Sequence, residues 1–226
     1  MNKDYDKKYF ENLSGYGKYG GYSKMQKDMI KWYNGIFGFL KRKSNIDLQQ
    51  GNERRILDVG CAYGYILSEL NKNNFKTYGV DISDYAVKIA KMQNKTCKVK
   101  VGDIQKGIPF EEEFDFILCL EVIEHLQNLE IALRNIYSSL KKGGHFIVTT
   151  PNPDSKSILY SPCKDPTHIS LNSAAEWIKL MKKAQFKKID YWTIHAVPLS
   201  KYLTGKVEHI SVPDFMGGTI LMVCKK

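Results

Sequence analysis

The most informative stretch of the chain is Ile56-Leu57-Asp58-Val59-Gly60-Cys61-Ala62-Tyr63-Gly64-Tyr65. Its first four residues are typical of a buried strand, and they run directly into a glycine-containing turn and then a predicted helix over 64–73. Glycines let the backbone of such a turn approach a ligand closely, and the first turn of the helix offers unpaired N–H groups to an anionic group. The spacing Gly60-x-x-x-Gly64 differs from the G-x-G-x-x-G of dinucleotide-binding proteins. The stretch therefore predicts a ligand-binding strand, turn and helix.

Strands and helices alternate from Arg55 to Thr150, and further elements follow. Short apolar or β-branched runs predict further strands at 76–80, 97–101, 114–119, 145–149, 187–196 and 217–224. Predicted helices lie between them, at 64–73, 83–94, 128–141 and 172–184, and Lys141-Lys142-Gly143-Gly144 is the expected stop of the third. Such alternation indicates an α/β, doubly wound fold, with a mostly parallel seven-stranded sheet and helices on both faces.

Three acidic residues accompany the first three predicted strands. Asp58 lies in the first strand, Asp81 ends the second, and Asp103 follows the third within Gly102-Asp103-Ile104. The carboxyl ends of parallel strands meet at one crevice, where open α/β sheets bind ligands and where an acid after the second strand takes ribose hydroxyls. Asp103 is placed to reach an adenine amino group, so the three acids predict a nucleoside-containing cofactor.

Residues 56–150 resemble class I S-adenosylmethionine-dependent methyltransferases, which have a Rossmann-like fold. The matching stretches are 56–65, 78–83, 102–104, 114–121 and 140–151. The resemblance implies that S-adenosylmethionine is the cofactor, with its methionine end near Gly60, Cys61 and Gly64, its ribose on Asp81 and its adenine on Asp103. The full cofactor site that we expect consists of Asp58, Gly60, Cys61, Ala62, Gly64, Tyr65, Asp81, Ile82, Gly102, Asp103, Ile104 and Leu120.

The chain departs from the family pattern at two positions. Many members have glycine where this chain has Ala62, although a small residue is tolerated there. Beyond residue 150 the resemblance is looser and includes Asp165-Pro166-Thr167-His168 and, after a helix, Ala184-Gln185-Phe186. The common form of that last element ends in Gly-Phe, so Gln185 is the second departure.

The run Leu120-Glu121-Val122-Ile123-Glu124-His125-Leu126 directly follows the fourth predicted strand. It resembles both ubiquinone-pathway O-methyltransferases and small-RNA 3′-end methyltransferases, in which the matching Glu, Glu and His bind a divalent metal. The metal ligands implied here are Glu121, Glu124, His125 and His168, and such ligands suit Mg²⁺ or Mn²⁺.

The same run also occurs in metal-free members, where Glu121 and His125 only shape the floor of the pocket. Catalytic candidates are therefore Glu121 on the pocket floor and His125 or His168 as general base, since histidine titrates near neutral pH. We expect Glu121, Glu124 and His125 to share one helical face and His168 to converge with them on the acceptor side of the cofactor.

Residues 1–50 are predicted to form a helical extension that acts as a lid, and residues 51–226 the methyltransferase domain. The extension contains a Gly/Tyr cluster at 15–22 and a helix at about 23–43 with one apolar face, which we expect to pack on the core. The cluster, the loop 151–170 and the segment 197–213 are expected to close over the pocket and to set acceptor selectivity.

Composition favours a small-molecule acceptor over a nucleic acid. The net charge is +10, but the positive charge comes almost wholly from lysine. Recognition of phosphate by two parallel hydrogen bonds favours the planar guanidinium group of arginine. Arginine occurs only at 42, 54, 55 and 134. The chain has no apolar run long enough to span a membrane and a charged N-terminus, so we expect a cytoplasmic protein; its five cysteines lack a C-x-x-C pair and are expected to be free. Nothing in the sequence indicates an oligomeric state.

The sequence thus predicts methyl transfer from S-adenosylmethionine to an oxygen or nitrogen atom of a small molecule. Two alternatives remain: an enzyme like the metal-dependent RNA 3′-end 2′-O-methyltransferases, and a non-catalytic cofactor-binding subunit that keeps the fold. A nicotinamide-dependent oxidoreductase is disfavoured, because it predicts G-x-G-x-x-G and leaves Asp103 unexplained.

Overall fold

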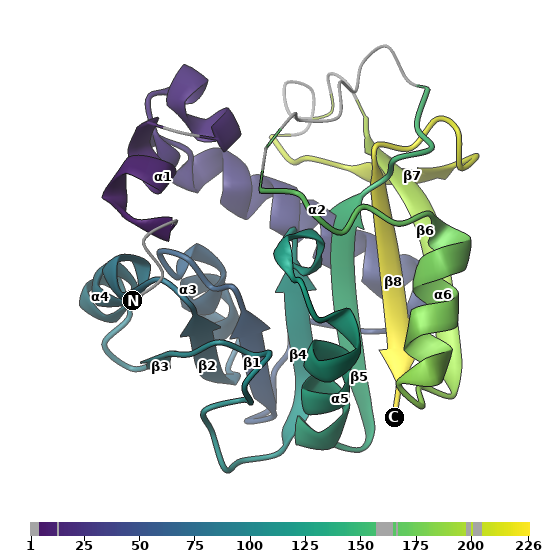
Figure 1. Cartoon of the computed structure of the whole chain (residues 1–226). Helices are drawn as coiled ribbons and strands as arrows, with labels where there is room; N and C mark the ends of the chain where they lie inside the picture. Colours follow the sequence, from purple (N-terminus) through teal and green to yellow (C-terminus); the bar gives the residue numbers. More distant parts are fainter. Residues whose placement is uncertain (1–4, 13, 157–164, 166, 198–199, 201–204) are drawn as a thin grey trace.

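The computed structural model describes residues 5–12, 14–156, 165, 167–197, 200 and 205–226. Its centre is an eight-stranded sheet in the order β3-β2-β1-β4-β5-β8-β6-β7 (Figure 1). The strands are β1 (Arg55–Val59), β2 (Lys76–Asp81), β3 (Lys98–Val101), β4 (Phe114–Leu120), β5 (Leu140–Pro151), β6 (Lys188–Ala196), β7 (His209–Val212) and β8 (Thr219–Lys225).

Strands β3, β2, β1, β4 and β5 are parallel, whereas β8 is antiparallel to both β5 and β6, and β7 is antiparallel to β6. The chain builds outward from β1 through β2 to β3 and then returns to the other side of β1 with β4. The strand order therefore reverses between β1 and β4, which is where open α/β sheets form a binding crevice at their carboxyl edge. The predicted α/β doubly wound fold is confirmed.

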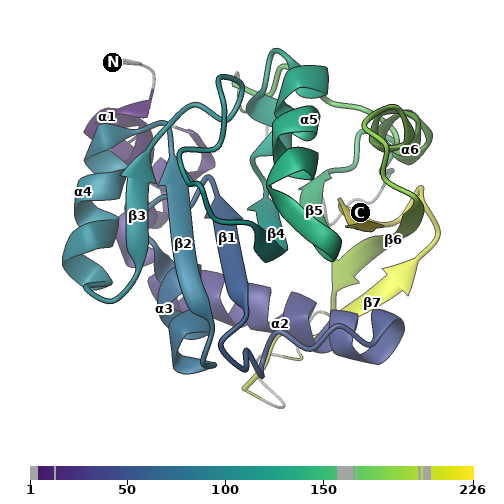
Figure 2. The same ribbon diagram turned by 90° about the horizontal axis from the view of Figure 1, so that it is seen from below.

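Helices cover both faces of the sheet (Figure 2). On one face lie α2 (Gln26–Ser44), α3 (Tyr65–Lys72) and α4 (Asp84–Gln93); on the other lie α5 (Leu129–Ser139) and α6 (Ala174–Lys183). The alternation of side chains in the strands fills both layers: Ile56 packs with Phe37 of α2, whereas the next residue, Leu57, belongs to the cluster that contains Trp177 of α6. This two-sided burial explains why β1 and β4 are mostly apolar and do not alternate between apolar and polar residues.

Two predicted boundaries were wrong around Gly143. The helix predicted at 128–141 ends at Ser139, and β5 begins at Leu140, where it pairs with Phe114. The register of this pairing shifts between Phe114 and Phe116, and Gly143 takes a left-handed conformation with φ 81°. Gly143 and Gly144 therefore lie in an irregular part of β5 and do not end a helix.

The sheet has one strand more than the predicted seven, because β7 was missed. This short strand pairs with β6 at the edge of the sheet and lies against α2. A Cβ on Gly35 would come within 2.3 Å of the Val207 carbonyl oxygen, so this glycine permits the close approach of helix and strand. The prediction that 197–213 closes over the pocket was therefore wrong for residues 209–212; residues 198–199 and 201–204 lie outside the described residues.

Residues 5–24, here called the N-terminal segment, sit above the carboxyl edge of the sheet (Figure 1). They include the short helices α1 (Lys7–Asn12), η2 (Ser14–Tyr19) and η3 (Tyr22–Lys24). α2 follows at once and buries Ile36 and Leu40 against the sheet, as predicted from its apolar face. In the described part of the chain, no helix is long and apolar enough to cross a membrane.

The two departures from the family pattern have the same structural explanation. Ala62 has φ 44° and Gln185 has φ 75°, so both lie in the left-handed region that favours glycine. Glycine at either position would adopt this conformation without the steric cost that a Cβ brings.

Candidate active site

A cavity of about 430 Å³ opens at the carboxyl edge of β1, β2, β3 and β4, in the size range of small-molecule and cofactor sites. Its described lining falls into three groups. The strand ends and loops contribute Val59, Gly60, Ala62, Val80, Asp81, Ile82, Gly102, Asp103, Ile104, Gln105 and Leu120. The segment after β4 contributes Glu121, Val122, His125, Leu126 and Gln127, and the segment between β5 and α6 contributes Thr167 and Ile169. The N-terminal segment and α2 contribute Tyr5, Tyr9, Phe10, Tyr16, Tyr22, Met29 and Tyr33.

Asp81 ties the turn after β1 to the end of β2. One of its carboxylate oxygens accepts a hydrogen bond from the Ala62 N–H and the other from the Ser83 N–H, each at 2.8 Å. Burial raises the pKa of Asp81, and these backbone donors oppose that shift. Each oxygen keeps a further lone pair, so a buried acceptor stands at the cavity wall beside the glycine turn.

Eight of the twelve predicted cofactor residues line the cavity. They are Gly60, Ala62, Asp81, Ile82, Gly102, Asp103, Ile104 and Leu120. Gly60 has φ 72°, and a Cβ on it would come within 2.3 Å of the Val122 side chain, so this position in the turn requires glycine.

The other four predicted cofactor residues lie behind this wall. Cys61 packs with Leu67 in the layer beneath α3 and α4 and is not among the residues that line the cavity. Tyr65 stacks on Tyr22 of the N-terminal segment at a centroid distance of 5.4 Å, and Gly64 is the N-cap of α3. Asp58 is buried, and burial, together with the neighbouring charge of Asp81, raises its pKa to about 8.

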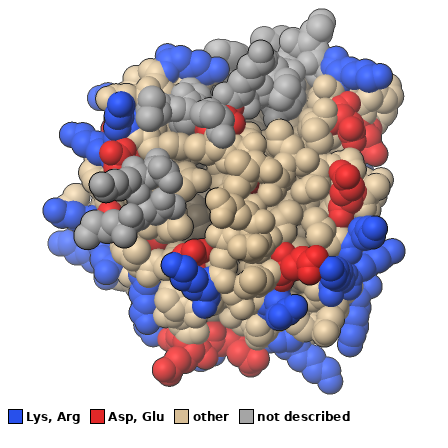
Figure 3. All heavy atoms as spheres, viewed as in Figure 1, with Lys and Arg blue, Asp and Glu red and all other residues tan. Residues whose placement is uncertain are grey.

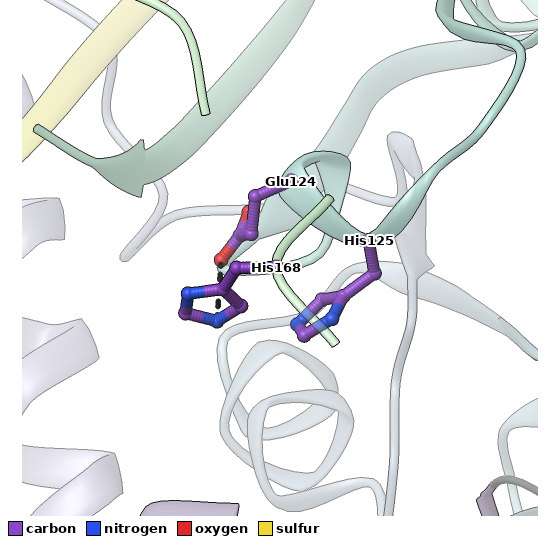
Figure 4. Close-up of side chains that lie close together, drawn as sticks. All are labelled: Glu124, His125 and His168. Carbon is purple, nitrogen blue, oxygen red and sulfur yellow. Dashed lines mark ion pairs between the residues drawn. The ribbon is translucent and has the colours of Figure 1, made fainter. Parts of the chain in front are cut away.

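Glu124, His125 and His168 come together where His125 lines the cavity. Glu124 and His125 project from the short helix η4 (Ile123–His125), and His168 reaches them from a separate segment (Figure 4). One ligand atom from each of the three lies within 4.8 Å of the other two, the two imidazole centroids are 4.8 Å apart, and His168 Nε2 is 3.9 Å from Glu124 Oε1. The predicted convergence of these three side chains is therefore observed.

The route to this convergence differs from the prediction. Glu121 precedes η4 with a left-handed φ of 56°, and η4 is a single 3-10 turn, so Glu121, Glu124 and His125 do not share a helical face. Glu121 lines the cavity but is not part of the three-residue group. A positive φ on a residue other than glycine costs energy, and here it turns the chain sharply at the end of β4.

Burial controls the electrostatics of this cluster. It raises the pKa of Glu121 to about 7 and, with the charge of Glu121 added, raises the pKa of Glu124 well above its ordinary value. Burial lowers the pKa of His125 to about 4, and His168 adds to that shift. Three buried oxygens, Glu121 Oε1 and both of Glu124, have no hydrogen-bond partner among the described residues. The cluster therefore combines unsatisfied carboxylate oxygens with neutral imidazoles.

Aromatic side chains of the N-terminal segment and α2 cover the cavity. The sequence indicated a lid in this region but did not identify the individual residues that line the cavity. Tyr5 meets the His125 ring edge-on at 6.2 Å, and the Ser83 hydroxyl donates to the Tyr5 carbonyl at 2.6 Å. The Tyr63 hydroxyl donates to Glu11 at 2.6 Å, which joins the N-terminal segment to the glycine turn. The Gly/Tyr cluster was the available signal for this cover, but Tyr33 belongs to an apolar stripe that was expected only to pack on the core.

The comparisons with known proteins agree with this geometry. The family described as "Methyltransferase domain" matches residues 23–191. A ubiquinone biosynthesis O-methyltransferase of Rickettsia typhi is 29% identical over 153 residues, which cover 61% of this chain and 62% of that protein. The protein of the same name from Rickettsia felis is 31% identical over 150 residues, which cover 59% of this chain and 62% of that protein. The chain thus spans about three-fifths of the length of these curated relatives.

Among solved structures, a SAM-dependent methyltransferase from Archaeoglobus fulgidus has the same fold. The TM-score is 0.65 at 20% sequence identity, and the alignment covers 88% of this chain and 94% of that chain. The family match extends over more than half of the present chain and includes the strand ends, the glycine turn and η4. The chain therefore belongs to the class I S-adenosylmethionine-dependent methyltransferase family, whose cofactor is S-adenosylmethionine.

Proposed function

We propose that this protein transfers a methyl group from S-adenosylmethionine to a hydroxyl oxygen of a small-molecule acceptor. The observation that carries this proposal is a cavity lined both by eight of the predicted cofactor residues and by Glu121 and His125, which follow β4. The names of the Rickettsia relatives, both O-methyltransferases, support oxygen as the methylated atom. The sulfonium makes the methyl group reactive, so the protein mainly aligns the acceptor and excludes water.

In this proposal the strand ends hold the cofactor. Asp81 accepts hydrogen bonds from the ribose hydroxyls while the Ala62 and Ser83 N–H groups fix its carboxylate. Asp103 takes the adenine side, and its Oδ1 is held by the Gln105 N–H at 3.0 Å. The turn at Gly60 leaves room for the methionine end, because a side chain there would collide with Val122.

The residues on the acceptor side fit a divalent cation. Three buried carboxylate oxygens lack partners among the described residues, and burial keeps both imidazoles neutral by lowering the pKa of His125 and of His168. Glu124, His125 and His168 would hold Mg²⁺ or Mn²⁺, with Glu121 beside them at the cavity wall. Such a cation would supply Lewis-acid chemistry by lowering the pKa of an acceptor hydroxyl. Independently of the cation, Glu121 at the cavity wall serves as the proton acceptor, a role that suits a carboxyl group whose pKa is raised to about 7.

A small acceptor is supported by the aromatic cover of the cavity and by the charge distribution. Aromatic side chains of the N-terminal segment cover the cavity, which suits a compact molecule better than an extended strand. On the described part of the face in Figure 3, basic residues (Lys or Arg) and acidic residues are mixed around the rim, and the centre is mostly uncharged. Arg42 and Arg54, which could bind phosphate, instead donate to backbone carbonyls.

We also propose that the N-terminal segment is the lid, and that the lid is shorter than the 1–50 extension predicted from the sequence. α2 packs into the same core as β1 and β4, whereas residues 5–24 lie over the cavity. The division at residue 50 and the cytoplasmic location remain predictions.

The test is methyl transfer from methyl-labelled S-adenosylmethionine to a small-molecule extract and, in parallel, to total RNA. We expect label in the small-molecule fraction, lost with EDTA and restored by Mg²⁺ or Mn²⁺. Glu121→Gln and Glu124→Ala should each abolish transfer, whereas Glu130→Gln on the exposed surface of α5 should not. Label in the RNA would contradict the acceptor class. If activity survives EDTA but falls with His125→Ala or His168→Ala, the mechanism uses a histidine general base and not a cation.

A further inference from the structure

Asp165 and Thr167 form a hydrogen-bonded group that contacts one ring nitrogen of His125, Nδ1. The Thr167 carbonyl oxygen lies 3.1 Å from His125 Nδ1, and the Thr167 hydroxyl lies 2.9 Å from the same nitrogen. Asp165 Oδ1 in turn lies 2.9 Å from the Thr167 backbone nitrogen and 2.5 Å from its hydroxyl oxygen. Asp165 and Thr167 are not among the residues to which the sequence assigned a role.

The direction of each hydrogen bond in this group follows from its chemistry. The Thr167 N–H donates to Asp165 Oδ1, so this oxygen is an acceptor, and the Thr167 hydroxyl must donate its single proton to it as well. The hydroxyl then has only lone pairs to offer His125, and the Thr167 carbonyl can only accept. His125 Nδ1 must therefore carry the proton and donate it to Thr167.

The residues that follow Thr167 are hydrogen-bonded to η4 and to the residue after it, so His168 is flanked by contacts on both sides along the chain. The backbone N–H groups of Ile169 and Ser170 both donate to the Glu124 carbonyl oxygen, at 3.0 and 2.9 Å. The Ser170 hydroxyl donates to the Leu126 carbonyl at 2.6 Å. His168 lies between the hydrogen-bonded group and these contacts, so together they fix both imidazoles relative to Glu124 (Figure 4).

We propose that Asp165 and Thr167 are positioning residues that hold His125 in the Nδ1–H tautomer. Nε2 is then the bare nitrogen, available to a cation or to the acceptor. A histidine whose second nitrogen is fixed in this way offers its free nitrogen in one orientation and one protonation form. The inference deepens the proposed function, on which its catalytic meaning rests, but the tautomer itself can be measured without acceptor or metal.

The experiment is long-range ¹H–¹⁵N correlation NMR of histidine-labelled protein at neutral pH, free of metal, with His125→Gln used to assign the signals. In the wild type we expect the proton on Nδ1 of His125. Thr167→Val removes the hydroxyl acceptor, and Asp165→Ala frees the Thr167 hydroxyl to donate to Nδ1. Each should lower the ratio of the Nδ1–H to the Nε2–H form by about five- to tenfold, as expected for one lost hydrogen bond. Thr167→Ser keeps the hydroxyl and should retain the wild-type ratio.

Two results would overturn the inference: a wild-type protein with the proton on Nε2, or ratios within twofold of wild type in both Thr167→Val and Asp165→Ala. Thermal melting and S-adenosylhomocysteine binding show whether each variant is folded. A merely structural role for the hydrogen-bonded group would lower the melting temperature and leave the tautomer unchanged. Failure of methyl transfer would contradict the proposed function without changing the tautomer, so the two failures are distinguishable.

Discussion

Replacing Gln185 by glycine should stabilise the protein. Gln185 follows α6 and has φ 75°, which is the left-handed conformation at the C′ position of a helix. The Phe186 N–H donates to the Met181 carbonyl at 3.2 Å and the Gln185 N–H donates to the Lys182 carbonyl at 3.0 Å, which together form a Schellman motif. Met181 and Phe186 are both buried in the core, so this end of the helix is fixed and cannot relax to another conformation.

The expected gain follows from two opposing contributions. A side chain in the left-handed region costs roughly 1–2 kcal/mol relative to the right-handed region, and glycine removes that cost. Glycine also loses more backbone entropy on folding, about 0.5–1 kcal/mol compared with alanine. The net stabilisation is therefore about 0.5–1 kcal/mol, and in a chain of this size it raises the melting temperature by roughly 1–4 °C.

The assay is thermal and urea unfolding of the wild type and Gln185→Gly. Ala184→Gly, one residue earlier, is the matched control, because Ala184 has φ −78° and gains nothing from glycine. The control should be destabilised by about 0.5–1 kcal/mol. The explanation of the family departure would be refuted if Gln185→Gly were as unstable as the control.

Three further predictions concern the cofactor, the lid and pH. Asp81→Ala should weaken S-adenosylmethionine binding by about tenfold or more, since a buried charged acceptor is lost, whereas Asp84→Ala on the neighbouring helix should not; equal calorimetric affinities would contradict the ribose role. Tyr63→Phe removes the 2.6 Å hydrogen bond to Glu11, so stopped-flow measurements should show several-fold faster cofactor release, and an unchanged rate would argue against a latched lid. Burial lowers the pKa of His209 to about 4, below its value of about 6.5 in an unfolded chain, so its folded form binds fewer protons. The neutral His209 therefore contributes up to about 3 kcal/mol to the free energy of unfolding; this contribution is complete above pH 6.5 and is lost as the pH falls toward 4. Urea unfolding of His209→Gln should show a smaller decrease in the free energy of unfolding over this pH interval, and an unchanged decrease would exclude His209 as its source.

The convergence of Asp81 and Asp103 on one cavity could be predicted from the sequence because backbone position determines it. Asp81 ends β2 and Asp103 follows β3, and the carboxyl ends of such parallel strands meet wherever a sheet of this topology forms. The side-chain direction of Cys61 could not be predicted, because it depends on the left-handed turn at Gly60 and Ala62. A small change in the backbone angles of such a turn decides whether a side chain points into the cavity or into the layer behind it.

The acceptor side was predicted in part, for a different reason. The pattern identified Glu124, His125 and His168, but a helical face was expected where a single 3-10 turn occurs. Tyr33 shows a second limit of prediction from the sequence. The apolar stripe of α2 places Ile36 in the core and Tyr33 at the cavity wall. The spacing of apolar residues alone does not distinguish a ring packed in the core from a ring that lines a cavity. The short strand β7 offered too few residues for alternation to be recognised.

The central claim is that the cavity at the carboxyl edge binds S-adenosylmethionine. Isothermal titration calorimetry of the purified protein with S-adenosylmethionine, S-adenosylhomocysteine and NADH tests it most directly. We expect micromolar dissociation constants for the first two ligands and no heat with NADH. Binding of NADH without heat from either of the other two would contradict the account.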